Sequence, residues 1–585
     1  MSTASPGSDP ARAAKLKERI AAMELELERP TPGSARPGAL ERAHARAKAV
    51  DGIVSEVLDE ALDAAGIPRD KCGIAVVGVG GYGRAELSPR SDVDLVFVLD
   101  GRPPRLPGVK PAPDAADPRR AVVERALYAL WDSGLEIGHA VRTIADCIAV
   151  GRKEVTARSS LLDHRFVAGS RDVYDHFAGA LEKRLFKIDA PGFVTAKLLE
   201  ISRRRERFGA AVSRNEPNLK EGEGGLRDAH TAMWIARAVW GLRDANGFTH
   251  ARLARKEDVA EFLAAFERLL EIRSELHRLS GRKEDRLSFD RQEAVARALG
   301  FDGGVHATER FMQTVTQTMA AVQRFLQLVI DQMPARFHAH AERAHAIPHR
   351  HPVARAPRGF RVRRGRVLFV DGEAASHAPD MMVRIFAVSA RLGIPLHPEA
   401  RALVRSHLPA LGAARDQRPA VEAFWDLLLT PEADAVERAL LEMNDLGALG
   451  AFLPEFAPLF GRLQHDTYHV YTCDAHLLLA VANVHRLVAG KWEGKEPLLT
   501  ELGRALPIRK LVGGVLTHDI GKSEPSHTAV GLRMLPRIAA QLRMSADEQA
   551  QIHFLIEQHL LMSHVAQRRD LSDPKTITDF AHAVG

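Results

Sequence analysis

Two short apolar runs near the N-terminal end of the chain predict a strand, a turn and a second strand. Residues 74–79 are apolar or glycine, and residues 95–99 form the second run. Runs of this length, bounded by glycine and proline, are typical of buried strands. The paired glycines Gly80 and Gly81 predict a tight turn that leads into a short helix. Residues 136–143 are expected to form a further strand of the same sheet.

Most of the remaining chain has apolar residues three and four positions apart, which is the spacing of amphipathic helices. Helices are expected over 11–29, 39–65 and 121–133, through most of 150–335, and from 380 to the end. The predicted fold class is an α+β N-terminal domain with a mixed sheet, followed by a helical domain and an all-α region.

Composition narrows the class of protein. The 585 residues are 45% hydrophobic and 27% charged, with a net charge of +6, as in an ordinary globular protein of several domains. The three cysteines, Cys72, Cys147 and Cys473, are scattered, which favours a reducing compartment over a disulfide framework. No apolar run is long enough to span a membrane and no signal peptide is evident, so we expect a cytoplasmic protein.

Two aspartates open the second apolar run. Asp92 and Asp94 are expected on the same face, because side chains alternate along a strand. Neighbouring carboxylates repel each other, and oxygen ligands on a rigid element favour Mg²⁺ completed by substrate phosphates. Gly80 and Gly81 allow the backbone to approach a phosphate closely. The pattern predicts a nucleoside triphosphate site; the alternative is an ordinary turn with two solvated aspartates.

A second candidate site follows the apolar run 511–516, in the string Thr-His-Asp-Ile-Gly-Lys. His518 and Asp519 can both reach one metal ion, and this ligand pair suits manganese, iron, zinc or magnesium. Upstream, His469 and His476 are seven residues apart and share one helix face. Further candidates downstream are His527, His553, His559, His564, Asp570 and Asp573. Any single histidine among these has the simpler interpretation of a core or surface side chain.

Together these motifs resemble known families. The glycine pair, spacer and Asp-x-Asp resemble the nucleotidyltransferase superfamily, and the His-Asp dyad resembles HD-type phosphohydrolases. Two unusual segments, 216–230 and 273–290, lie between the sites, and 465–476 precedes the second. Four motifs occur in order: the glycine pair with Asp-x-Asp, then segments 216–230, 273–290 and 465–476. On these motifs, residues 40–585 closely resemble the bacterial PII uridylyltransferase/uridylyl-removing enzyme family.

The resemblance implies a bifunctional regulator of nitrogen metabolism. Such an enzyme transfers UMP from UTP to a tyrosine of the PII signal protein and also hydrolyses UMP from modified PII. It implies Mg²⁺, with Mn²⁺ able to substitute, and no nucleic-acid or membrane partner. The implied organisation is a flexible segment 1–38, a nucleotidyltransferase domain 39–190, a helical domain 191–335, a basic connector 336–379 and a helical region 380–585 with the HD domain from about 461.

Site residues are carried over position by position. Gly80 and Gly81 match the phosphate-facing pair, while Asp92 and Asp94 match the metal carboxylates. The third carboxylate stays open between Glu136 and Asp228. The hydrolase metal is expected on His476, His518, Asp519 and Asp573. His469 is the alternative to His476 as the first ligand, and Asp570 is the alternative to Asp573 as the last. Arg84 and Arg90 are expected phosphate contacts.

Three other interpretations share parts of this pattern. A tRNA nucleotidyltransferase with an HD domain has the same domain order, but segment 216–230 argues against it. A guanosine tetraphosphate synthetase/hydrolase has its HD part first, and a regulatory protein without catalysis would not need intact metal ligands. Members of the resembled family continue into glutamine-binding ACT domains. Because this sequence ends at Gly585, we expect little or no response to glutamine.

Overall fold

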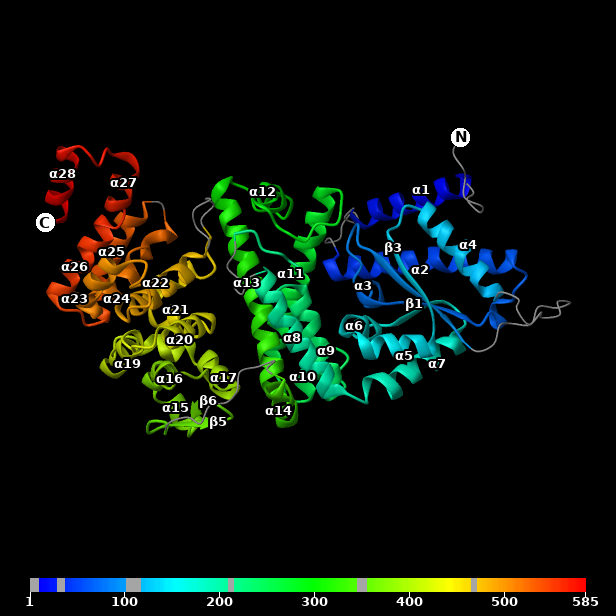
Figure 1. Cartoon of the computed structure of the whole chain (residues 1–585), viewed down its shortest axis with the longest axis horizontal. Helices are drawn as coiled ribbons and strands as arrows, with labels where there is room; N and C mark the ends of the chain where they lie inside the picture. The colour runs from blue at the N-terminus through cyan, green and yellow to red at the C-terminus, as the bar shows by residue number, and fades with distance from the viewer. Residues whose placement is uncertain are drawn as a thin grey trace. The chain divides into compact units, whose positions relative to one another are not determined.

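A computed structural model describes residues 10–28, 37–100, 117–208, 215–344, 355–463, 471–524 and 526–585. The chain divides into two compact units (Figure 1). The first unit comprises Met1–Val212, Glu216–Asp302 and Ala321–Pro348. The second comprises Ser213–Asn215, Gly303–Ala320 and His349–Gly585.

The first unit contains a four-stranded mixed sheet. Its strands are β1 (Ile74–Gly78), β2 (Val93–Leu99), β3 (Ile137–Thr143) and β4 (Arg165–Gly169), in the spatial order β3-β2-β1-β4. Strand β1 is antiparallel to both β2 and β4, whereas β2 and β3 are parallel. The short helix α3 (Gly80–Gly83) follows β1 at the glycine pair. The predicted strand, glycine turn, short helix and strand are therefore confirmed.

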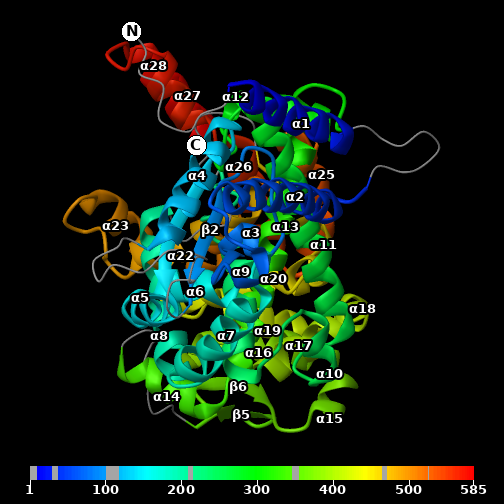
Figure 2. The same cartoon turned by 90° about the vertical axis from the view of Figure 1, so that its right-hand side faces the viewer.

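Helices cover both faces of this sheet, as Figures 1 and 2 show. These helices are α2 (Ala39–Ala64), α4 (Pro118–Asp132), α5 (Ile144–Lys153), α6 (Val155–Leu162), α7 (Arg171–Leu181) and η2 (Glu182–Phe186), while η1 (Arg69–Lys71) precedes β1. Val76 and Phe97 pack with α2 and α4, whereas Val77 and Val98 pack with α5, α6 and α7. Alternate residues of β1 and β2 thus enter opposite cores, which explains why their sequences are apolar throughout.

The segment expected to be flexible contains a packed helix, α1 (Pro10–Glu28). Helix α1 contacts α2, and Leu16 is buried in the core that includes one face of the sheet. Arg46 on α2 donates hydrogen bonds of 2.7 and 2.8 Å to the Glu24 carboxylate. The periodicity predicted the helix, but its docking depends on these partners from other parts of the chain.

The expected helical stretch follows the sheet. It consists of α8 (Ala190–Phe208), α9 (Leu226–Trp240), α10 (Asn246–His250), α11 (Lys256–Ser280), α12 (Phe289–Ala298), α13 (Val305–Gln332) and α14 (Ala335–Arg343). Helix α13 is divided between the two units at Ala320. Helices α8, α9 and α11 contribute side chains to the wall of the first candidate site.

The second unit is almost entirely helical, with one hairpin. Its elements are β5 (Phe360–Arg363), β6 (Arg366–Phe369), α15 (Gly372–Ser376), α16 (Pro379–Leu392), α17 (Pro398–Ser406), α18 (Leu408–Ala413), α19 (Arg418–Leu428), α20 (Ala433–Asp445), α21 (Ala448–Phe452), η3 (Pro454–Leu459), α22 (Cys473–Val488), α23 (Pro497–Ala505), α24 (Ile508–Thr517), η4 (Ile520–Ser523), α25 (His527–Gln541), α26 (Ala546–Gln558), α27 (Leu561–Arg568) and α28 (Pro574–Val584). One apolar core joins the hairpin to the helices up to α25.

The basic connector expected over 336–379 is largely folded. It contains α14 and the hairpin of β5 and β6, while residues 345–354 lie outside the described part of the chain. Phe360 and Leu368 are buried in the core of the second unit, whereas Arg361 stays exposed. Val367, Leu368 and Phe369 of β6 are all buried, whereas the arginines of the hairpin are exposed or half-buried. The sequence at Val362 and 367–370 looks strand-like, although the default interpretation of the arginine-rich segment is a solvated linker.

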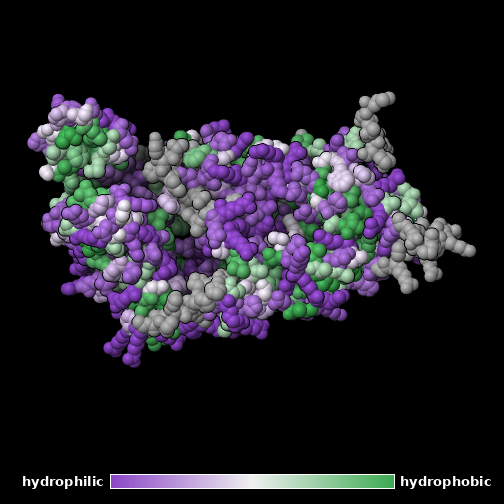
Figure 3. All heavy atoms as spheres, viewed as in Figure 1, coloured by the Kyte–Doolittle hydropathy of each residue, from purple (hydrophilic) through white to green (hydrophobic). Residues whose placement is uncertain are grey.

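The C-terminal helices α27 and α28 bury none of their side chains. Figure 3 shows apolar surface over this part of the second unit, where Met562, Leu571 and Ile577 are each at least half exposed. These helices therefore lie outside the core of the second unit. None of the helices in the described ranges has the length and apolar character that crossing a membrane requires.

Candidate active sites

The first candidate site lies where β1 ends and β2 begins. Asp94 is the second residue of β2, and Asp92 immediately precedes the strand. Both aspartates line a cavity of about 600 Å³ together with Gly80 and Gly81. Asp94 stands opposite Gly138 in the parallel pairing of β2 and β3. The structure thus brings together the four residues that the sequence assigned to phosphate and metal binding.

The two carboxylates influence each other. Burial raises the pKa of Asp94, and the neighbouring charge of Asp92 raises it further. Burial also acts to raise the pKa of Asp92, but the hydrogen bond and positive charge of Lys283 outweigh it and lower that pKa. A divalent cation between the carboxylates would relieve their repulsion, so the donor set fits an oxygen-coordinated metal ion.

The two candidates for a third carboxylate have different surroundings. Glu136 immediately precedes β3, and its carbonyl accepts a 2.8 Å hydrogen bond from the amide of Val93, the neighbour of Asp92. Its side chain is exposed and lines a different cavity, beside α1. Asp228, near the start of α9, is buried and ion-paired with Arg204, and it accepts a 2.8 Å hydrogen bond from the Gly224 amide. Glu136 is therefore the candidate on the strand next to Asp92, whereas Asp228 stabilises the turn before α9.

Two glycines leave room for the Asp94 carboxylate. Gly80 has a φ of +58°, and a Cβ atom there would lie 3.4 Å from Asp94 Oδ2. A Cβ atom on Gly138 would lie 2.4 Å from Asp94 Oδ1. That separation is far shorter than van der Waals contact, so any larger residue at position 138 must displace the carboxylate.

Basic side chains line the same cavity as the carboxylates. They are Arg84, Lys197, Arg203, Arg204, Arg207, Lys220, Arg227, Arg273 and Lys283. The segments 216–230 and 273–290, both noted as unusual in the sequence, supply four of these nine. They are joined by the Leu219 amide, which donates to the Asp285 carbonyl at 2.8 Å. A cavity with carboxylates and so many cations suits a polyphosphate with its metal ions.

Of the two arginines expected at the phosphates, only Arg84 lines this cavity. Its guanidinium donates to the carboxylates of Glu86 and Asp163, so much of its charge is neutralised within the protein. Arg90 is exposed and lines a separate cavity of about 690 Å³ beside α1. Arg90 was expected to contact phosphate, but its side chain lies with residues of α1 instead.

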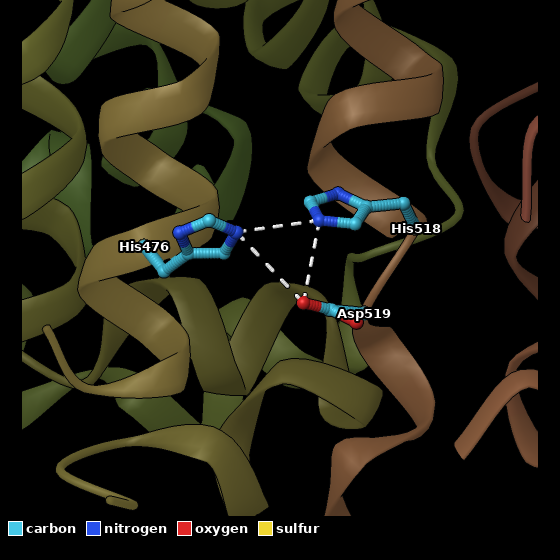
Figure 4. Close-up of side chains that lie close together, drawn as sticks. All are labelled: His476, His518 and Asp519. Atoms are coloured by element: carbon cyan, nitrogen blue, oxygen red, sulfur yellow. Dashed lines mark hydrogen bonds and ion pairs between the residues drawn. The ribbon is translucent and has the colours of Figure 1, made fainter. Parts of the chain in front are cut away.

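The second candidate site gathers His476 from α22 with His518 and Asp519, which directly follow α24 (Figure 4). His476 Nε2 lies 3.3 Å from His518 Nε2, and Asp519 Oδ2 lies 3.3 Å from His518 Nε2 and 3.8 Å from His476 Nε2. Three ligand atoms at such distances can hold one metal ion.

A second group of possible ligands shares Asp519 with the first. His527 Nε2 and His559 Nε2 lie 3.8 and 3.6 Å from Asp519 Oδ1. The sequence marked both histidines as candidates but gave them no role. They come from α25 and from the residue that follows α26, so only the packing of these helices brings them to Asp519.

Hydrogen bonds orient two of the imidazoles toward Asp519. His518 Nδ1 donates to the Val515 carbonyl at 2.9 Å, and His559 Nδ1 donates to the Ile556 carbonyl at 2.7 Å. The Nε2 lone pairs therefore face the carboxylate. Asp519 Oδ1 and His559 Nε2 are buried and have no hydrogen-bond partner among the described residues. Acceptors that face each other in this way fit a bound cation.

Asp519 is charged within this cluster. Burial alone would raise its pKa, but the interaction with His518 and the charge of Lys522 outweigh burial and hold the pKa below its usual range. Lys522 Nζ lies 2.7 Å from Asp519 Oδ2, and both side chains are buried. A Cβ atom on Gly521 would lie 2.0 Å from the His527 carbonyl oxygen, so the glycine allows η4 to pack closely against α25.

The structure does not bring Asp573 to this cluster. Asp573 is exposed and caps α28 by accepting a 3.0 Å hydrogen bond from the Lys575 amide. Its rival Asp570 is also exposed and accepts from the Ser572 amide at 2.9 Å. His469 lies outside the described residues, so the choice of His476 over His469 as the first ligand stays a prediction. Spacing along the chain could not show that the segment carrying Asp570 and Asp573 lies outside the core.

Comparisons with known proteins cover both candidate sites. Residues 192–330 match a family model described as GlnD PII-uridylyltransferase. A protein of Ruegeria pomeroyi named bifunctional uridylyltransferase/uridylyl-removing enzyme is 35% identical over 94% of this chain and 60% of its own length. Proteins of the same name from Cereibacter sphaeroides and Azospirillum brasilense are 34% identical over 92% and 87% of this chain, and over 57% and 54% of their own lengths. The chain thus spans three fifths or less of these relatives, and the resemblance inferred from its motifs is confirmed.

Proposed function

We propose that this chain, which is related over 94% of its length to the bifunctional uridylyltransferase/uridylyl-removing enzymes, carries out both activities that their name describes. In this proposal it transfers UMP from UTP to a tyrosine of a PII-type signal protein and hydrolyses UMP from the modified protein. The observation that carries the proposal is the presence of two separate ligand clusters, one of carboxylates beside a basic cavity and one of histidines around Asp519. With UTP as substrate, we place the activity in the cytoplasm.

In the transfer reaction, the tyrosine oxygen forms a bond to the α-phosphorus of UTP and pyrophosphate leaves. Asp92, Asp94 and Glu136 would hold Mg²⁺ or Mn²⁺, which supplies charge stabilisation for the entering and leaving oxygens when bound. Lys220 and Arg273 face the cavity and orient the triphosphate through charge-assisted hydrogen bonds. Gly80, with its positive φ, keeps the turn clear of the Asp94 carboxylate.

In the removal reaction, water attacks the phosphorus and the bond to the tyrosine oxygen breaks, releasing UMP. His476, His518 and Asp519 would hold one metal ion, which lowers the pKa of water when bound, and Asp519, His527 and His559 are a second possible ligand set. The backbone carbonyls of Val515 and Ile556 keep the imidazole lone pairs aimed at this centre.

The proposal is tested by incubating the protein with Mg²⁺, each labelled nucleoside triphosphate and a PII protein, with tRNA as the alternative acceptor. We expect label from UTP on PII, and release of UMP from uridylylated PII in a separate reaction. Labelling of tRNA instead of PII would favour the tRNA nucleotidyltransferase alternative. The names of the relatives support transfer and removal of uridylyl groups, and the description of the matching family model names PII.

Gly138 offers a test of the transferase geometry. We expect Gly138→Ala to slow UMP transfer by roughly 100-fold, because a carboxylate displaced by about 1 Å no longer holds its ion correctly. UMP removal should not change. Gly179→Ala is the matched control, since a Cβ atom on that α7 glycine meets nothing within 4 Å. Parent-like transfer by Gly138→Ala, measured on a protein with normal thermal unfolding, would contradict the role given to Asp94.

A further inference from the structure

The ammonium group of Lys283 lies on one of the carboxylates that the proposed transfer reaction uses. Lys283 Nζ donates a hydrogen bond to Asp92 Oδ2, and the two side chains are 34% and 38% exposed. The residues are 191 positions apart in the sequence, and both line the same cavity. The ion pair is therefore accessible to solvent and to any ligand of the cavity.

The loop that carries Lys283 is firmly held. It connects α11 to α12, and Asp285 in the loop accepts a 2.7 Å hydrogen bond from Arg273 Nε. Arg273 Nη1 also donates to Ser88 Oγ at 3.0 Å, and His277 Nδ1 lies 2.6 Å from the Pro89 carbonyl oxygen. These bonds join the loop to the segment just before Asp92. The backbone of the loop thus stays in place even when the Lys283 side chain moves.

An ammonium group and a divalent cation compete for the same carboxylate oxygen. Asp92 Oδ2 cannot give its charge fully to both, and the two cations repel each other at such short range. Lys220, from the turn before α9, and Arg273 line the same cavity. A Lys283 side chain released from Asp92 therefore remains among the cations that face the phosphates of a bound nucleotide.

We propose that Lys283 is an exchangeable counter-cation, which neutralises Asp92 until the divalent cation and nucleoside triphosphate bind and then moves to the phosphates. The inference rests on the proposed function, because it assumes that this cavity takes a nucleoside triphosphate with its metal ion. It deepens that function by giving the loop after α11 a role in coupling metal binding to nucleotide binding. Metal ions then bind weakly at Asp92 unless the nucleotide provides a second place for the lysine.

Lys283→Met tests the first half of this exchange. Mn²⁺ alone, without nucleotide or acceptor, should bind the first site roughly fivefold more tightly in Lys283→Met than in the parent, because its competitor is gone. Binding is measured by calorimetry in full-length protein that also carries His518→Ala and Asp519→Asn, so that the second cluster does not contribute. Lys283→Arg, which keeps the charge, should bind Mn²⁺ like the parent.

The second half of the exchange predicts that the same substitution weakens binding of the nucleotide. In an otherwise unaltered chain, Lys283→Met should raise the KM for UTP roughly tenfold or more, because a charge-assisted hydrogen bond to phosphate is lost. Tighter binding of the metal together with weaker binding of the nucleotide is not expected from a residue that only stabilises its loop. Arg282→Gln is the matched control, since it removes the same charge from a neighbouring side chain that is 76% exposed.

Two results would overturn the inference. One is Mn²⁺ binding to Lys283→Met that is no tighter than to Arg282→Gln; the other is an unchanged KM for UTP. Failure of the proposed function looks different, because the parent would then transfer no UMP to PII. The Mn²⁺ titration needs neither UTP nor PII, so it judges the exchange at Asp92 in either case.

Discussion

Replacing both Asp92 and Asp94 with asparagine is expected to abolish UMP transfer and to leave UMP removal at the parent rate. Both carboxylates line the same cavity as the basic side chains, and neither belongs to the histidine cluster around Asp519. Asparagine keeps the shape of each side chain but removes the charge that holds a divalent cation. We expect transfer to fall by about 1,000-fold or more, since the metal stabilises both the entering and the leaving oxygen.

This experiment compares transfer of labelled UMP to PII with release of UMP from modified PII in the same preparations. Asp100→Asn with Asp132→Asn is a control of equal charge change, because neither residue lines the cavity that contains Asp92. Thermal unfolding shows whether the variants are folded. An equal loss of both activities in a folded Asp92→Asn, Asp94→Asn protein would contradict two independent sites.

The second large effect is expected at the histidine cluster. His518→Ala should reduce UMP removal by about 1,000-fold or more while transfer persists, because one of the three ligands that would hold the ion is lost. His564→Ala is the matched control, since this histidine is exposed on α27 and belongs to none of the ligand groups found among the described residues. Parent-like release of UMP by His518→Ala would show that the reaction takes place elsewhere.

The same assay distinguishes two ligand sets. His559→Ala should lower UMP removal by about 10-fold to 100-fold, whereas Asp573→Asn should leave it unchanged. The reason is position: His559 Nε2 lies 3.6 Å from Asp519 Oδ1, while Asp573 is an exposed helix cap. The opposite result, with loss of activity only in Asp573→Asn, would restore the ligand set that the family resemblance implied.

Sequence reasoning succeeded where the chemistry is local. Gly80, Gly81, Asp92 and Asp94 lie within 15 residues and share one strand, turn and strand, so the alternation of side chains was enough to predict their common face. His518 and Asp519 are adjacent, and no packing is needed to place them together. The resemblance to a family rested on four such local motifs, and the comparisons confirm it.

The tertiary structure decided what depends on which elements become neighbours. Lys283 reaches Asp92 across 191 residues, and His559 lies near Asp519, whereas Asp573, the ligand that the family resemblance implied, does not. Periodicity identifies the buried face of a helix but not the helix that packs against it. For the same reason the docking of α1 was missed, and the strand-like pattern at Val362 and 367–370 did not reveal that the hairpin packs into the core of the second unit. Their stability comes from partners distant in the chain, which only the folded protein brings into contact.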